Sequence, residues 1–243
     1  MTAGGSPATR TPRRVAETER YRQLHQDERS LRQQVATSLR DAILSGTLKP
    51  GQRLVEKQIS QGMHTSRGPL REALRQLEQE GLVMSFPYRG SFVSRISADE
   101  VREVLIPLRA TLEGFGFEHA VGKLTDADVA DLERILAHME EAIREGDLIG
   151  LVETDVAFHG LVMSRSGQPH TTQIWGTIAP RIRAYFYTHL RDVMPSQELL
   201  DRIPGDHRAL FDALVARDRE RVAALLLEHV RDLPGLTRPA TGS

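Results

Sequence analysis

Four side chains in the C-terminal half of the chain have the types and spacing to hold a divalent metal ion. Asp155 and His159 are four residues apart, so on a helix both project from one face. His207 and His229 lie in two later stretches of helical hydrophobic periodicity. A buried carboxylate and three imidazoles are costly without partners, and one metal ion would satisfy all four. On spacing alone, a histidine on an apolar face is more often a hydrogen-bonded core residue, so both interpretations stay open.

A second set of candidates is basic and lies nearer the N-terminus. Arg67 and Arg71 share one face of a predicted helix, and arginine can donate two hydrogen bonds to a guanine edge or grip phosphates. Arg89 and Gly90 fall at the tip of a predicted hairpin, within reach of a minor groove or the DNA backbone, and Lys57 suits a phosphate contact. Each arginine alone is more simply a solvated surface residue. The combined pattern predicts a DNA-reading surface.

The charge of the chain is divided unevenly, although its formal net charge is only −1. Residues 29–97 hold 11 Lys/Arg against 5 Asp/Glu, whereas residues 98–243 hold 16 against 24. A basic module beside an acidic one indicates a polyanionic partner for the first. Two solvated surfaces of unequal charge are the plainer alternative.

Composition excludes several classes of protein. The chain has no Cys, so disulfides and thiolate metal sites are excluded, in keeping with a reducing cytoplasm. Its 40% hydrophobic content is enough to build cores. No apolar run approaches the roughly 20 residues of a membrane span, and the N-terminus lacks the apolar stretch of a secretory signal. We therefore expect a cytoplasmic protein with no membrane partner.

The basic module reads as helix, helix, turn, helix and two-stranded hairpin. Apolar residues at helical spacing, an N-cap at Ser66 and a helix stop at Gly81 mark its elements. The predicted elements are helices from Ser30 to Gly46, at 54–62 and from Ser66 to Gly81, and strands at 82–86 and 91–96. This order within about 70 residues is typical of a winged helix-turn-helix.

The acidic module is helical throughout and shows no strand-like alternation. It opens on a capping box, in which Ser97 precedes Glu100 by three residues. The predicted helices lie near 97–121, 125–145, 147–165, 168–191, 196–216 and 218–232. Pro107, Pro180 and Pro204 fall inside helical stretches, where we expect a kink or an interruption.

The predicted fold is therefore mainly α, with an N-terminal winged helix-turn-helix of α+β type and a C-terminal all-α bundle of about six helices. We expect four segments: a disordered or flexible arm at 1–28, a DNA-binding domain at 29–97, an all-helical effector-binding domain at 98–233 and a tail at 234–243.

Three strings in the basic module carry a family resemblance: LRDAILSGTLKPGQRLVEKQIS, TSRGPLREALRQLEQEGLV and YRGSFV. Over residues 30–96 they closely resemble the DNA-binding domain of the GntR family of transcription regulators, in particular its FadR-like branch. The resemblance implies DNA contacts at Lys57, Ser66, Arg67, Gly68, Arg71, Arg89 and Gly90.

The acidic module resembles the helical ligand-binding domain called FCD, which accompanies this DNA-binding type. The Asp-x-x-x-His pair and two later histidines, 22 residues apart, carry the resemblance, together with Arg109 and Glu113. It implies that a divalent metal, zinc first and nickel or manganese as alternatives, is held by Asp155, His159, His207 and His229. It also implies small organic acids as effectors. Arg109 is our first candidate to bind such an acid and Arg183 the second, although each could be a surface or salt-bridge arginine.

Together these observations predict a ligand-responsive transcription regulator, expected to act as a repressor. A homodimer would present two recognition helices to a palindromic operator in double-stranded DNA. The alternatives are a metal-dependent hydrolase or lyase with an appended DNA-binding-like domain, and a helical scaffold with structural histidines. The sequence shows no nucleophile elbow, no phosphate-cradling glycine loop and no clear general base, so we expect no enzyme and assign no catalytic residue.

Overall fold

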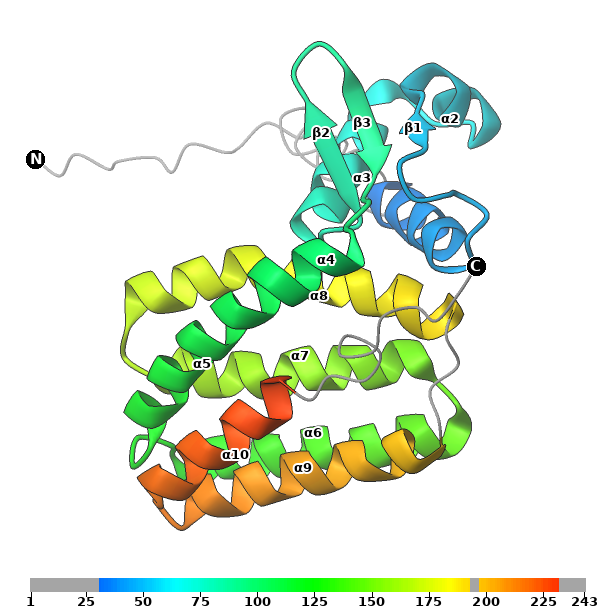
Figure 1. Cartoon of the computed structure of the whole chain (residues 1–243). Coiled ribbons are helices and arrows are strands. Elements are labelled where there is room, and N and C mark those ends of the chain that lie inside the picture. Colours follow the sequence, from blue (N-terminus) through cyan, green and yellow to red (C-terminus); the bar gives the residue numbers. More distant parts are fainter. Residues whose placement is uncertain (1–30, 193–196, 232–243) are drawn as a thin grey trace, which may run out of the picture.

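A computed structural model describes residues 31–192 and 197–231, which form a small mixed module joined to a larger helical one (Figure 1). The predicted arm at 1–28 and the tail at 234–243 lie outside the described residues. In Figure 1 the sheet and short helices occupy the upper part and the long helices the lower part. The observed class is therefore the predicted one, mainly α with a small N-terminal sheet.

The N-terminal module has the winged helix-turn-helix order. Its first helix is described over 31–44. The elements that follow are β1 (Arg53–Leu54), α2 (Glu56–Gly62), α3 (Arg67–Gln79), β2 (Val83–Phe86) and β3 (Gly90–Val93). The apolar faces of the first helix and α3 form its core, with Leu39, Ile43, Leu70, Leu74 and Leu77 all buried. Burial of these faces leaves the opposite side of α3 in solvent.

The sheet is antiparallel, in the order β1-β3-β2. Strand β1 was not predicted, because two residues are too few to show alternation. Strand β3 ends at Val93, three residues before its predicted end. Val93 pairs with Val83, the first residue of β2, so the residues after Val93 have no facing residue in β2.

The C-terminal module contains six long helices within the described residues. In chain order its elements are α4 (Ala98–Glu100), η1 (Val101–Leu105), α5 (Ile106–Ala120), α6 (Asp126–Glu145), α7 (Leu148–Arg165), α8 (Pro169–Asp192), α9 (Gln197–Val215) and α10 (Arg219–Arg231). Helix α5 packs against α7, α8 and α10 and leaves its other face exposed, including Leu108 and Phe115. None of the helices described here is long and apolar enough to cross a bilayer.

One predicted helix, at 97–121, is divided by a turn of π-helix. The N–H of Ile106 donates to the carbonyl of Val101, five residues back. Pro107 explains the wider turn, because its ring crowds the carbonyl four residues earlier and it has no N–H to donate. Helices α8 and α9 continue through Pro180 and Pro204, so the interruption that we expected as one outcome at these prolines does not occur.

Candidate nucleic-acid interface and metal centre

The first turn of α3 presents polar groups to solvent. Ser66 occupies the N-cap position as predicted, but within the described chain its hydroxyl makes no capping bond. Arg67 and Gly68 follow it, and all three residues are exposed. A Cβ added to Gly68 would meet no atom within 4 Å, so the packing of the protein does not itself require glycine there. A helix start with these groups can approach a DNA groove closely.

Arg71 lies one turn further along α3 and is held by a neighbour from α2. Its Nε donates to Glu56 Oε2 at 3.0 Å, and the two side chains are 59% and 36% exposed. Such an exposed pair contributes little to stability, but it orients the guanidinium. Glu56 was not identified from the sequence, because it is 15 residues from Arg71 and on a different helix. Lys57, the next residue, is exposed on the same helix.

The hairpin between β2 and β3 forms an exposed wing. Tyr88 and Gly90 adopt positive φ values of 63° and 89°, which turn the chain at the tip. The guanidinium of Arg89 lies over the ring of Phe86, 5.5 Å from its centroid. Both Arg89 and Gly90 are exposed, as a contact with a DNA backbone or minor groove requires.

The four predicted metal-binding residues converge in the helical module. Each offers a ligand atom, and these atoms lie within 4.8 Å of one another. Asp155 and His159 come from α7, His207 from α9 and His229 from α10. Asp155 Oδ1 lies 3.3, 3.8 and 3.9 Å from the Nε2 atoms of His207, His159 and His229. The helical spacing placed the first pair on one face, and the fold brings in the other two.

Three features of this donor set fit a metal ion. Ligand atoms about 2.1 Å from an ion lie roughly 3.0–3.4 Å apart. The His159–His229 and Asp155–His207 separations, 3.1 and 3.3 Å, fall in this range, and those from Asp155 to His159 and His229 are wider, at 3.8 and 3.9 Å. His207 Nε2 is buried without a hydrogen-bond partner among the described residues, while its Nδ1 faces the Ile203 carbonyl at 2.9 Å. His159 and His229 face each other through Nε2 atoms 3.1 Å apart. Imidazoles with one carboxylate suit zinc, nickel or manganese better than calcium.

A second layer of side chains orients the cluster. Glu113 Oε2 lies 2.8 Å from His159 Nδ1, and Glu113 Oε1 accepts from Arg109 Nε at 2.8 Å and from Trp175 Nε1 at 2.7 Å. Arg109 Nη2 donates to Asp155 Oδ2 at 3.3 Å. A carboxylate behind a histidine is the usual support of a metal ligand. The family resemblance pointed to Glu113, but nothing in the sequence indicated Trp175, which is 62 residues away.

Electrostatics hold the cluster in the protonation states that bind metals. Burial opposes the charged form of Asp155, but the guanidinium of Arg109 and the nearby imidazoles outweigh it and keep its pKa well below the usual range. Burial lowers the pKa of His159, and burial with two neighbouring imidazoles lowers that of His229. At neutral pH the carboxylate is therefore ionised and these two imidazoles are neutral.

The two predicted effector arginines lie in different places. Arg109 lines a cavity of about 10 Å³ beside the cluster, which is room for about one water molecule. The other lining residues are Glu113, Asp155, Val156, Trp175, Ala179 and Ile182. Arg183 is not among them, and its guanidinium bonds to Glu153 and to the carbonyl of Glu80.

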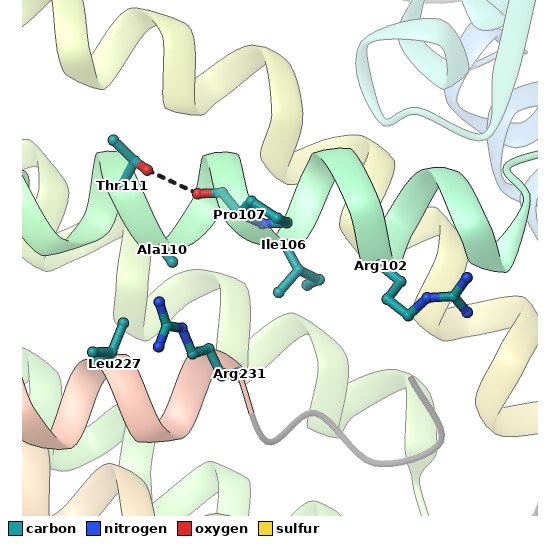
Figure 2. Close-up of a pocket in the computed structure, with 7 residues that line it drawn as sticks. All are labelled: Arg102, Ile106, Pro107, Ala110, Thr111, Leu227 and Arg231. Atoms are coloured by element: carbon teal, nitrogen blue, oxygen red, sulfur yellow. Dashed lines mark hydrogen bonds between the residues drawn. The ribbon is translucent and has the colours of Figure 1, made fainter. Parts of the chain in front are cut away.

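A larger groove of about 490 Å³ lies between η1, α5 and α10 (Figure 2). Its lining residues are Arg102, Ile106, Pro107, Ala110, Thr111, Leu227 and Arg231. None of the four clustered ligands belongs to this lining, so the groove is separate from the metal cluster. No residue predicted to bind DNA, metal or effector lines it.

Comparisons with known proteins cover both modules. Residues 31–93 match the model of the gntR family of bacterial regulatory proteins, and residues 104–232 match that of the FCD domain. The chain is 31% identical over 208 residues to the HTH-type transcriptional repressor RspR of Escherichia coli K12, which covers 83% of this chain and 86% of the relative.

Two further proteins extend the similarity. The chain is 27% identical over 202 residues to the gluconate operon transcriptional repressor of Bacillus licheniformis, covering 83% of this chain and 82% of the relative. The solved structure of E. coli McbR/YncC matches with a TM-score of 0.66 and 26% identity, over 83% of this chain and 93% of that one. No similarity of this group points to a hydrolase or a lyase.

Proposed function

We propose how the two modules of this chain divide its function, given that it belongs to the gntR family of bacterial regulatory proteins. A member of this family with an FCD domain is a DNA-binding transcription regulator. In this proposal the module at 29–97 reads a palindromic operator. The module at 98–233 binds a divalent metal and a small organic acid that together control operator binding. The convergence of Asp155, His159, His207 and His229 is the observation that carries the proposal.

The exposed groups around α3 divide the reading of DNA among them. Arg67 and Arg71 read base edges in a major groove, supported by Ser66 and by the close approach that Gly68 permits. Lys57, together with Arg89 and Gly90 of the wing, contacts phosphates or the minor groove.

The clustered ligands hold a divalent ion, zinc first and nickel or manganese as alternatives. A bound ion supplies a Lewis-acidic centre to which a carboxylate can bind. Arg109 is placed to attract that carboxylate, since it lines the cavity beside Asp155. The cavity has room for little more than a water molecule, so an organic acid requires the helices around it to separate.

An exposed apolar stripe along η1 and α5 supports a homodimer. Val104, Leu108 and Phe115 are 43–49% exposed, at spacings of four and seven residues that place them on one helix face. Exposed apolar faces of this kind commonly mark protein interfaces. A second copy packed there would give the two-fold symmetry that a palindrome mirrors. We also propose repression as the mode of action, since two relatives are named repressors, and the cytoplasm as the location.

Selection of bound duplexes from a random pool tests the DNA assignment. The wild-type chain should enrich a short palindrome, and the Arg67→Ala/Arg71→Ala variant should enrich none. Repeating the selection with Zn²⁺ and a panel of organic acids should change the yield for the true effector class. If the wild-type protein enriches no motif, the operator assignment is wrong.

Metal analysis of chelator-stripped and reloaded protein tests the cluster. We expect one equivalent of Zn²⁺ per chain in the wild type and loss of stoichiometric binding in His207→Gln. His138→Gln is the matched control, because His138 is exposed on α6 and outside the cluster. Equal binding by the two variants would refute the assignment.

A further inference from the structure

Helix α8 reaches from the metal centre to the end of the recognition helix α3. Near its start, Trp175 donates to Glu113, the carboxylate beside His159. Further along, α8 meets the chain directly after α3, where a Cβ added to Gly81 would lie 2.3 Å from the Pro180 carbonyl oxygen. Only glycine allows such an approach, and Figure 1 shows α8 at the junction of the two modules.

Arg183 ties the same elements together with its guanidinium. Nη2 donates to the carbonyl of Glu80, the C-cap residue of α3, at 3.1 Å, and Nη1 donates to Glu153 Oε2 on α7 at 3.3 Å. The side chain is only 17% exposed, and its Nε is buried without a hydrogen-bond partner among the described residues. Burying a charged group is costly, so these two bonds fix its position closely.

On one side, Arg183 reaches the helix that carries two of the metal ligands. Glu153 lies two residues before Asp155 on α7, and its carboxylate also accepts a bond from the Tyr187 hydroxyl of α8. An ion held by Asp155 and His159 therefore constrains the stretch of α7 to which α8 is bonded.

On the other side, Arg183 reaches the rear of the recognition helix. The Glu80 carboxylate is held by Arg40 of the first helix through bonds of 2.6 and 2.9 Å. Helix α3 has 13 residues and carries Arg67 and Arg71 at its opposite end. A helix of this length is a rod of about 20 Å, so a small shift at Glu80 changes the tilt of the DNA-facing turn.

We infer that Arg183 is a positioning residue that transmits the state of the metal centre to the recognition helix. This inference rests on the proposed function, since it requires an ion at the cluster and DNA at α3. Arg183 acts on operator affinity without touching either ligand. Because binding couplings are reciprocal, operator DNA must change the affinity for the ion by the same factor.

The variant Arg183→Met tests this role, since it removes both bonds and keeps a side chain of similar reach. Affinity for the selected operator is measured with the full-length chain, chelator-stripped and with one equivalent of Zn²⁺. Zn²⁺ should change the wild-type affinity about fivefold or more, as is typical of coupled sites. In Arg183→Met the change should fall below about twofold, although one equivalent of Zn²⁺ still binds.

Arg181→Met is the matched control. Arg181 is an exposed arginine two residues earlier on α8 that donates to the Thr177 carbonyl of its own helix. This variant should keep the full response to Zn²⁺. A full response in Arg183→Met overturns the inference, as does a wild-type affinity that Zn²⁺ leaves unchanged although ion and operator both bind. Failure of the proposed function is distinguishable, because the wild type then binds no operator motif or no ion.

Hydrogen exchange gives a second readout that does not involve DNA. The amides of Gly81 and Leu82 bond back to the carbonyls of Glu78 and Leu77 at the end of α3. In Arg183→Met, peptides that cover these residues should exchange several-fold faster, whereas in Arg181→Met they should exchange as in the wild type. Unchanged exchange in Arg183→Met would count against the inference.

Discussion

The arginines of the two modules are held in opposite ways. The Arg71 side chain on α3 is 59% exposed and pairs with one carboxylate, whereas Arg109 on α5 is 4% exposed and lies between Glu113 and Asp155. An exposed arginine keeps much of its hydration and can meet a partner from outside. A buried one is held first by the carboxylates around it, so a carboxylate from outside must compete with them. The same type of side chain is thus open to an external partner in one module and is held within a buried cluster in the other.

Arg109→Met should have the largest effect, and it should act on stability. Without the guanidinium, Glu113 and Asp155 lose their main counter-charge, and breaking one side of a buried pair typically costs about 3–5 kcal/mol. Urea denaturation of metal-free protein measures this cost. Arg134→Met is the control, because Arg134 forms an exposed pair with Asp131 on α6. This variant should change the free energy of unfolding by less than about 0.5 kcal/mol. Similar values for both variants would remove the contrast between the modules.

Alanine at Arg67 or Arg71 should act on DNA affinity instead. Each substitution should weaken operator binding by about 1–3 kcal/mol, with a smaller dependence on salt, if the side chain contacts bases and phosphates. The free energy of unfolding should stay within about 0.5 kcal/mol of wild type, because both residues are exposed. Fluorescence anisotropy at several salt concentrations provides the measurement. A variant that loses stability but keeps operator affinity would reverse the assignment.

A glycine at the boundary between the modules, Gly81, can be compared with one inside the helical module, Gly146. Each follows the end of a helix and has a positive φ, 75° for Gly81 and 70° for Gly146. A Cβ on Gly146 would meet nothing within 4 Å, so Gly146→Ala should cost only the backbone strain of about 1–2 kcal/mol. Gly81→Ala should cost about 1–3 kcal/mol more, since its Cβ meets the α8 backbone. Thermal unfolding of both variants measures the two costs. Equal costs would mean that the α8 backbone can move away from the added Cβ at little cost.

Mild acidification from neutral pH should have the smallest of these effects. It should lower the free energy of unfolding through the buried histidines of the cluster. Folding lowers the pKa of His159 and His229, whereas histidines in the unfolded chain titrate near 6.5. Below about pH 6.5 the unfolded state therefore binds more protons, so the free energy of unfolding of the metal-free protein should fall. Urea titrations from pH 7.5 to 5.5 measure the slope. Stability that rises on acidification would contradict these directions.

Local signals in the sequence were enough to predict most of the fold. Ser97 accepts a bond from the Glu100 amide, as its capping pattern predicted, and Gly146 ends α6 with positive φ. Caps, stops and helical periodicity depend on neighbours along the chain, so they can be read without the tertiary structure. The two-residue β1 and the π-turn before Pro107 were not predicted, because neither has a periodic pattern of its own.

The candidate site could be predicted only in part. The helical spacing of Asp155 and His159 identified one face of α7, and the family resemblance pointed to the other two members of the cluster, His207 and His229. The contacts of Arg183 could not be predicted, because Glu153 and Glu80 lie 30 and 103 residues away in the sequence. The same holds for Trp175 behind Glu113. Such contacts depend on how helices pack, which no local pattern records.

The π-turn at Val101–Leu105 makes the connector between the modules one residue longer than an α-helix of the same span. A π-turn holds one more residue than an α-turn, so deleting one residue there, such as Arg102, should restore a regular helix and leave the residues before it facing nearly as they do now. The same deletion in the regular helix α6 would instead rotate everything before it by about 100°. The connector can therefore shorten by one residue in this turn without changing the direction in which the winged module faces.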